Sequence, residues 1–212
     1  MRQSALTTQE GLIFTDYFKL NIDTEEVLAH FGYTFSSNEL TLPQNTHEVF
    51  WYEDLHQRIH ASLPYISLTS EMARREFLIA PILIDLARYN HVKVKVEFPL
   101  EVSNQLRGTI DYYIQAKHNF LVIEAKNADL QRGFTQLSAE LMALDQWIEE
   151  ITPTLYGAVS IGNVWQFGKL DRAEKHISQD LLLYRVPTDL HDLLRILLGI
   201  LGEDGILSLI HI

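Results

Sequence analysis

The sequence predicts an α/β protein in which helices flank one central mixed β-sheet. Hydrophobic periodicity alternates along the chain between the spacing of a helix and that of a strand. From residue 69 onward the expected order is helix, three strands, helix, strands, helix, which is typical of a mixed sheet. The 212 residues, 47% of them hydrophobic, are enough for one domain with a sizeable core. We expect an N-terminal helix and hairpin segment, residues 1–64, packed on a core of residues 65–212.

The N-terminal segment is expected to hold two helices with a hairpin between them. Asp23 or Thr24 caps the first helix, residues 23–32, and acidic residues fill its first turn. Residues 33–42 suggest a small hairpin. Residues 46–63 have helical periodicity and form the second helix.

The core is expected to begin with a long helix, residues 68–90, which Pro81 kinks. Polar and apolar residues then alternate as in a strand, and a hairpin follows later in the chain. The expected strands are residues 91–102, 105–116, 120–126 and 180–186, with the hairpin at 155–170 turning near Gly162 and a turn at 117–119. Further helices are expected at residues 129–150 and 189–202.

Composition limits the classes of function. The net charge of −11 argues against indiscriminate binding of nucleic acid, because phosphate contacts need Lys and Arg. Residues 88–133 are the one part of the chain in which Lys and Arg outnumber Asp and Glu. The chain has no cysteine, and residues 1–14 lack the apolar core of a signal peptide. The apolar run at 193–202 is too short to cross a membrane and contains Arg195, so we expect a cytoplasmic protein with no membrane partner.

Acidic residues occur inside two strands that are otherwise apolar. Glu124 and Lys126 are two positions apart in "LVIEAKNADL", so their side chains share one face of a strand. Asp111 lies within "GTIDYYI", in the preceding strand. If the two strands pair, both carboxylates reach one edge of the sheet and repel each other unless a cation lies between them. Oxygen ligands of this kind suit Mg²⁺ or Mn²⁺.

Two helical residues complete the candidate site. Glu76 has small or apolar neighbours at helical spacing, and a carboxylate on such a stripe needs a partner. Gln136 lies early in the helix after Lys126, where Gly133 would allow the helix to approach the sheet edge closely.

Over roughly residues 69–170, the order of these residues resembles the PD-(D/E)xK nuclease superfamily: an acid in a helix, Asp in one strand, Glu-x-Lys in the next and Gln in the following helix. The resemblance implies a restriction-endonuclease-like core. It also implies that Asp111, Glu124 and the carbonyl of Ala125 bind the metal, and that Lys126 orients water or stabilises the transition state. Glu76 would support metal binding, and Gln136 would contact water or phosphate. Ile110 stands where the family name has Pro.

A second element also resembles members of that superfamily. The pattern Gly-x-x-Trp-x-Phe, formed by Gly162, Trp165 and Phe167, recurs in the strand pair that follows the active site at the start of type I restriction subunits. The resemblance gives these residues a structural role, in packing the hairpin on the sheet.

The resemblance implies a Mg²⁺-dependent nuclease that acts on nucleic acid, with DNA expected. The alternative is a catalytically silent protein of the same fold that serves as a binding or assembly subunit. Each site residue also has a structural interpretation: a surface ion pair for Glu124 and Lys126, a turn residue for Asp111, an ion pair with Arg75 for Glu76, and a helix-surface residue for Gln136. The C-terminal helix is apolar nearly all round, which predicts burial in its own domain or in a homodimer.

Overall fold

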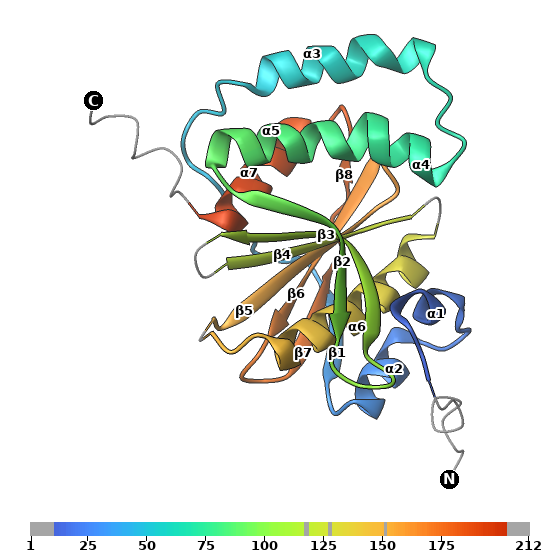
Figure 1. Ribbon diagram of the computed structural model, residues 1–212. Helices are drawn as coiled ribbons and strands as arrows, with labels where there is room; N and C mark the ends of the chain where they lie inside the picture. The colour runs from blue at the N-terminus through green and yellow to red at the C-terminus, as the bar shows by residue number, and fades with distance from the viewer. Residues whose placement is uncertain (1–10, 117–118, 127–128, 151, 203–212) are drawn as a thin grey trace.

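A mixed eight-stranded sheet forms the centre of the protein (Figure 1). The computed structural model describes residues 11–116, 119–126, 129–150 and 152–202. The strand order is β1-β7-β6-β5-β4-β3-β2, with β8 paired to β6. The strands are β1 (Thr34–Asn38), β2 (Lys93–Glu101), β3 (Arg107–Ala116), β4 (Asn119–Ala125), β5 (Thr154–Ser160), β6 (Val164–Asp171), β7 (His176–Asp180) and β8 (Tyr184–Arg185).

The pairing of the strands confirms the predicted mixed sheet. Strand β3 is antiparallel to both β2 and β4, β4 and β5 are parallel, and β6 is antiparallel to both β5 and β7. A parallel pair needs a long crossover, and α6 (Leu130–Trp147) provides it between β4 and β5. The turn expected at 117–119 falls mainly on residues 117–118, outside the described residues.

Two strand predictions were wrong. Residues 33–42 do not form a hairpin, because Thr34–Asn38 is a single strand whose backbone pairs in parallel with β7. Residues 180–186 do not form one strand, because Asp180 ends β7 and only Tyr184–Arg185 forms the short β8. The preceding strand, β7, was missed because its sequence HISQD is polar although most of it is buried. The chain turns at Asp180, whose Oδ1 accepts hydrogen bonds from the backbone N–H groups of Leu40 and Leu182, both at 3.1 Å.

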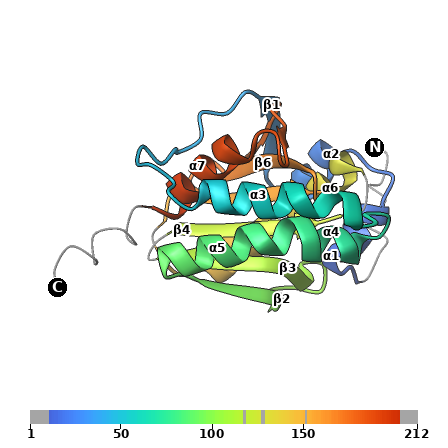
Figure 2. The same cartoon turned by 90° about the horizontal axis from the view of Figure 1, so that it is seen from above.

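Helices cover both faces of the sheet (Figures 1 and 2). One face carries α1 (Phe14–Lys19), α2 (Thr24–His30) and α6, and α1 was not predicted. The opposite face carries α3 (Tyr52–Ser62), followed by the 3₁₀ turn η2 (Leu63–Tyr65), then α4 (Glu71–Arg74), the π-helical turn η3 (Arg75–Ile79), α5 (Ala80–Asn90) and α7 (Leu190–Leu201). The π-helical turn interrupts the predicted long helix just before Pro81, which cannot donate a backbone hydrogen bond.

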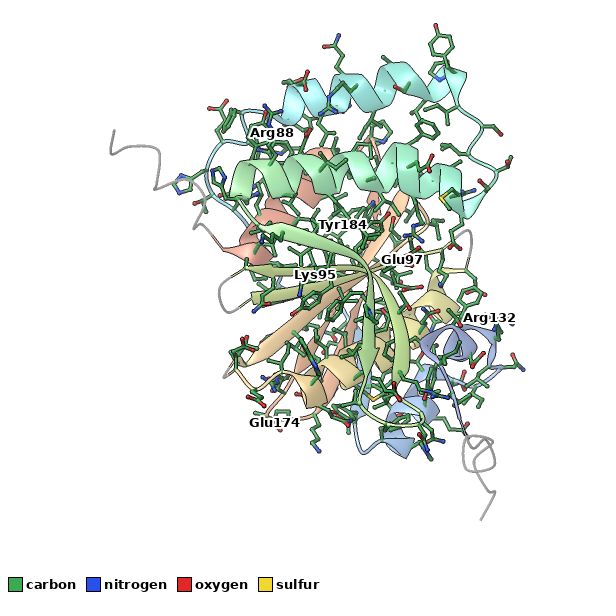
Figure 3. All side chains as sticks on the ribbon, viewed as in Figure 1. Arg88, Lys95, Glu97, Arg132, Glu174 and Tyr184 are labelled. Atoms are coloured by element: carbon green, nitrogen blue, oxygen red, sulfur yellow. The ribbon has the colours of Figure 1, made fainter. Side chains whose placement is uncertain are left out.

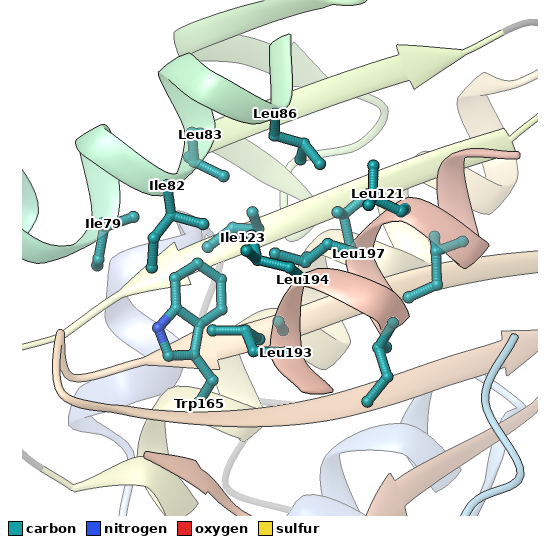
Figure 4. Packing of buried hydrophobic residues seen from close by; sticks show 14 of the residues in the cluster. Ile79, Ile82, Leu83, Leu86, Leu121, Ile123, Trp165, Leu193, Leu194 and Leu197 are labelled. Carbon is teal, nitrogen blue, oxygen red and sulfur yellow. The ribbon is translucent and has the colours of Figure 1, made fainter. Parts of the chain in front are cut away.

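The C-terminal helix α7 is buried within its own chain. Its Leu193, Leu194 and Leu197 pack against Ile123 of β4 and Trp165 of β6, and these side chains are almost or fully inaccessible (Figure 4). The apolar face that suggested a homodimer is therefore covered by the chain itself, and the dimer stays an untested prediction. Within the described residues, no helix has the length and apolar character that crossing a bilayer requires.

The hairpin of β5 and β6 turns where it was predicted. Gly162 adopts a φ of +87° in the turn, and its N–H donates to Ser160 Oγ at 3.0 Å. Trp165 and Phe167 are fully buried in the core between the sheet and α7, which confirms their packing role.

Candidate active site

The candidate site begins where the pairing of β3 and β4 ends. The ladder runs as far as Tyr112 opposite Ile123, so Asp111 and Glu124 come next on the two strands. Asp111 Oδ2 accepts a hydrogen bond from the Ala125 N–H at 2.9 Å, which gives that backbone group a side-chain acceptor beyond the end of the ladder. The expectation that both carboxylates reach one edge of the sheet is thus met by the geometry.

Lys126 forms an ion pair with Glu124. The Glu124 side chain is 1% exposed and the Lys126 side chain 12%. The backbone N–H of Lys126 donates to the Ser160 carbonyl at 2.8 Å, so pairing with β5 fixes the chain at this point. Burial, the largest single influence, lowers the pKa of Lys126, but the charges of Glu124, Asp111 and Glu140 and the hydrogen bond to Glu124 together outweigh it, so the net shift is upward. Lys126 is therefore a protonated cation in the site rather than an exposed surface residue.

Gln136 links the helix α6 to the carboxylates. Its Nε2 donates to Glu124 Oε1 at 2.7 Å and to Glu140 Oε1 at 3.0 Å. The helix approaches the sheet as the sequence predicted, because a Cβ at Gly133 would lie 2.7 Å from Val159 Cγ1. The interpretation of Gln136 as an ordinary helix-surface residue is wrong, since the residue is 1% exposed.

Glu140 is a site residue that the sequence analysis missed. It is fully buried, one helical turn after Gln136, among apolar side chains of α6. That spacing was the available signal: an acid four residues after Gln136 on an apolar face needs a partner for the same reason as Glu76 was expected to.

Crowding and burial change the ionisation of these acids. Burial, with the charge of Asp111 next and Lys126 acting in the opposite sense, raises the pKa of Glu124 to about 7. Burial and the charge of Glu124 raise the pKa of Glu140 well above its usual value. Three buried atoms here have no hydrogen-bond partner among the residues that the structure describes: Glu124 Oε2, Gln136 Oε1 and Glu140 Oε2.

Arg75, not Glu76, is the helical residue that contacts the site. Arg75 Nη1 donates to Asp111 Oδ1 at 3.3 Å, and its Nε donates to the Tyr112 hydroxyl at 3.3 Å. Glu76 is exposed on η3, so the expectation that it lies on a buried stripe is wrong. A π-helical turn holds one residue more than an α-helical turn, which changes the faces on which its side chains lie.

The donor set suits a hard divalent cation, although it is small. Among the described residues, no three His, Asp or Glu side chains are grouped so that they could together hold a metal. Two carboxylates and a backbone oxygen remain: Asp111, Glu124 and Ala125. The N–H of Ala125 points to Asp111, and a strand residue directs its carbonyl to the same side as its N–H. The unpartnered carboxylate oxygen of Glu124 and the crowding of acids are what a cation would relieve.

No protein-family model matches the chain, and neither a curated protein nor a solved structure matches it at a significant level.

Proposed function

We propose that the protein is a metal-dependent nuclease that hydrolyses phosphodiester bonds of nucleic acid, with DNA as the expected substrate. The observation that carries the proposal is the meeting of Asp111, Glu124, Lys126 and Gln136 at the point where the pairing of β3 with β4 ends. Asp111 lies in β3, Glu124 in β4 and Gln136 in α6, Lys126 directly follows β4, and the contact between Gln136 and Glu124 is buried. These four residues, together with Glu76, which lies outside the site, carried the resemblance to the PD-(D/E)xK superfamily and to its restriction-endonuclease-like core.

In this proposal, Asp111, Glu124 and the Ala125 carbonyl would hold Mg²⁺ or Mn²⁺. The chemistry that such an ion would supply is activation of water, by lowering its pKa, and neutralisation of charge on the phosphate. Gln136 fixes the orientation of Glu124 through the 2.7 Å hydrogen bond. Lys126 is protonated beside Glu124 and is placed to stabilise the charge that develops on the phosphate oxygens during in-line attack. Attack joins the water oxygen to phosphorus and breaks a P–O ester bond, which leaves a phosphate monoester and a hydroxyl.

One observation favours the alternative, a catalytically silent binding or assembly subunit. The Lys126 ammonium is already paired with Glu124, and Arg75 is paired with Asp111, so each proposed carboxylate ligand has a cationic partner without a metal. The net charge of −11 also opposes tight binding of nucleic acid by the protein alone.

A cleavage assay separates the two functions. Purified protein is incubated with supercoiled, linear, single-stranded and branched DNA and with RNA, in Mg²⁺ or Mn²⁺. We expect cleavage that falls by about 100-fold or more in Lys126→Ala. Lys93→Ala removes an exposed lysine at the start of β2 and serves as the matched control, which should retain activity. Metal binding without cleavage of any substrate would support the silent subunit, and loss of both would make the acids structural.

A further inference from the structure

A cavity of about 410 Å³ lies beside the candidate site. Lys126 and Gln136 form part of its wall, so it opens next to the proposed reacting centre. Residues of α1 and of the N-terminal end of α6 form most of the remainder, and Figure 3 shows Arg132 close to α1. The wall includes one aromatic ring and five charged side chains: Phe18, Lys19, Glu71, Lys126, Asp129 and Arg132.

The α1 side of the cavity is a fixed wall. Phe14 and Tyr17 are fully buried, and Tyr17 donates its hydroxyl hydrogen to the Gln105 carbonyl at 2.6 Å. Gly108 of β3 lets α1 come this close, because a Cβ there would lie 2.9 Å from Phe14 Cδ2. Phe18 is therefore held in place by its neighbours in α1.

The wall combines an aromatic ring with cations. The Lys126 ammonium lies 5.3 Å from the centre of the Phe18 ring. Arg132 is half-exposed and pairs with Asp129 at 3.3 Å, so its guanidinium can turn toward a phosphate at little cost. Lys19 also contributes a positive charge, whereas Glu71 and Asp129 are the acids. Three cations and two acids thus line the cavity, in a chain whose net charge is −11, and each cation has an acid beside it: Asp16 for Lys19, Glu124 for Lys126 and Asp129 for Arg132.

We infer that this cavity binds one unpaired nucleotide of a single-stranded polynucleotide, with the base against Phe18 and the adjoining phosphate between Lys126 and Arg132. The inference rests on the proposed nuclease function and names its substrate class. Aromatic rings stack on any base, and arginine and lysine contact the backbone, which is how single strands are bound without regard to sequence.

The size and position of the cavity favour an unpaired nucleotide over a duplex. A cavity of this volume is in the range that encloses one small molecule. A paired nucleotide would first have to leave its stack and lose its partner, which costs free energy that an unpaired nucleotide does not spend. Because Lys126 lies in the wall, the phosphate of the bound nucleotide comes next to the acids of the site.

Binding can be measured separately from cleavage, in EDTA, by fluorescence anisotropy. The probes are labelled oligothymidylate and oligouridylate of about 12 nucleotides and a DNA duplex of the same length. We expect the single strands to bind at least about tenfold more tightly than the duplex, and Phe18→Ala to weaken them by about tenfold. Arg132→Gln should reduce the slope of log affinity against log salt by about 0.7, the loss of one phosphate contact to a single strand.

Two matched variants serve as controls. Phe50→Ala removes an exposed ring that packs on Tyr89, and Lys93→Gln removes an exposed cation on β2; both should bind like the wild type. Since Phe18 is half-buried, Arg132→Gln tests the site even if Phe18→Ala unfolds. Comparison of the two single strands shows whether DNA or RNA is preferred.

The outcomes separate the inference from the function on which it rests. Cleavage of duplex and single strand at equal rates, or equal binding by all variants, would overturn the inference and leave the nuclease standing. Single-strand binding that depends on Phe18 and Arg132, without cleavage in any metal, would support the cavity and overturn the nuclease. If the protein neither binds nor cleaves any of these nucleic acids, both the inference about the cavity and the nuclease function are overturned.

Discussion

Asp111 and Ala125 are joined by a hydrogen bond of 2.9 Å between a side-chain carboxylate and a backbone N–H. The contact lies where the β3–β4 ladder ends, so the strand ends are held together by an acid instead of by a further backbone pair. The same contact directs the Ala125 carbonyl to the side of β4 on which Asp111 lies. A structural contact and a possible metal site are therefore built from the same two residues.

We predict that Asp111→Asn abolishes stabilisation by a divalent metal while the fold survives. Asparagine keeps an oxygen that can accept from Ala125, but it loses the charge. In the wild type, free Mn²⁺ at a hundredfold excess over Kd should add about 2.7 kcal/mol, or about 5 to 11 °C in the melting temperature. Asp54→Asn, which removes an exposed acid of α3, should keep the shift. A metal-induced shift in Asp111→Asn equal to the wild-type shift would exclude Asp111 as a ligand.

We predict that Gln136→Leu lowers the free energy of unfolding by about 3 kcal/mol. One amide nitrogen of Gln136 donates to both Glu124 and Glu140, and leucine would leave two buried carboxyl groups without that donor. Urea denaturation measures the loss. Gln115→Leu alters an exposed position on β3 and should change stability by less than about 0.5 kcal/mol. If the two variants lost equally little, the bridge would contribute nothing to folding.

The raised pKa of Glu124 predicts how stability depends on pH without metal. Its pKa rises from an ordinary value of 4.5 to about 7 on folding, chiefly through burial. Between these values the folded protein holds the proton more tightly than the unfolded chain does. This contribution to stability is thus fully present below about pH 4.5 and is lost as pH rises through about 7. The loss should be on the order of 3 kcal/mol.

Glu124→Gln isolates that contribution, because glutamine does not titrate. Stability measured in urea from pH 5 to pH 8, in EDTA, should fall less in this variant than in the wild type. Glu53→Gln, which changes an exposed acid of α3, should follow the wild type. Since a metal must displace the proton, binding of Mn²⁺ should strengthen over the same pH range. Parallel pH curves for wild type and Glu124→Gln would show that Glu124 does not carry the effect.

Local pattern was enough to predict most of the elements. Three elements have a pattern that is typical of only one secondary structure: β2 alternates, β4 is an apolar run, and α6 has helical periodicity. All three lie where they were expected. Strand β7 escaped prediction because its polar residues are buried by pairing with β1 and β6, and that burial depends on the whole sheet. The sequence of β7 alone does not indicate that β1 and β6 will pair with it and bury it.

The same distinction applies to the site. Asp111, Glu124 and Lys126 could be recognised because acids and a base in apolar strands stand out in the sequence. Arg75 could not, because its contact with Asp111 depends on a π-helical turn that brings it over the end of the sheet. The turn also leaves the predicted acid Glu76 in solvent. At this position of the helix, the site is therefore contacted by the base Arg75 and not by the expected acid Glu76.

We predict that Gly133→Ala disturbs the site as well as the fold. A Cβ at this position would lie 2.7 Å from Val159 Cγ1 and 3.3 Å from Lys126 Cγ, so α6 must move away from the sheet. Overpacking of this kind costs about 1 to 3 kcal/mol. The same displacement carries Gln136 away from Glu124, because both glycine and glutamine belong to one rigid helix. Stability and the metal-induced melting shift should therefore both decrease.

Gly199→Ala is the matched control for that variant. A Cβ at Gly199 would lie 2.5 Å from the Pro43 carbonyl, a clash at least as severe but located on α7. It should lower the free energy of unfolding by a comparable amount and leave the metal-induced shift unchanged. Loss of the shift in both variants would mean that it reports general destabilisation. Loss in Gly133→Ala alone would show that the close approach of α6 to β4 and β5 positions the carboxylates.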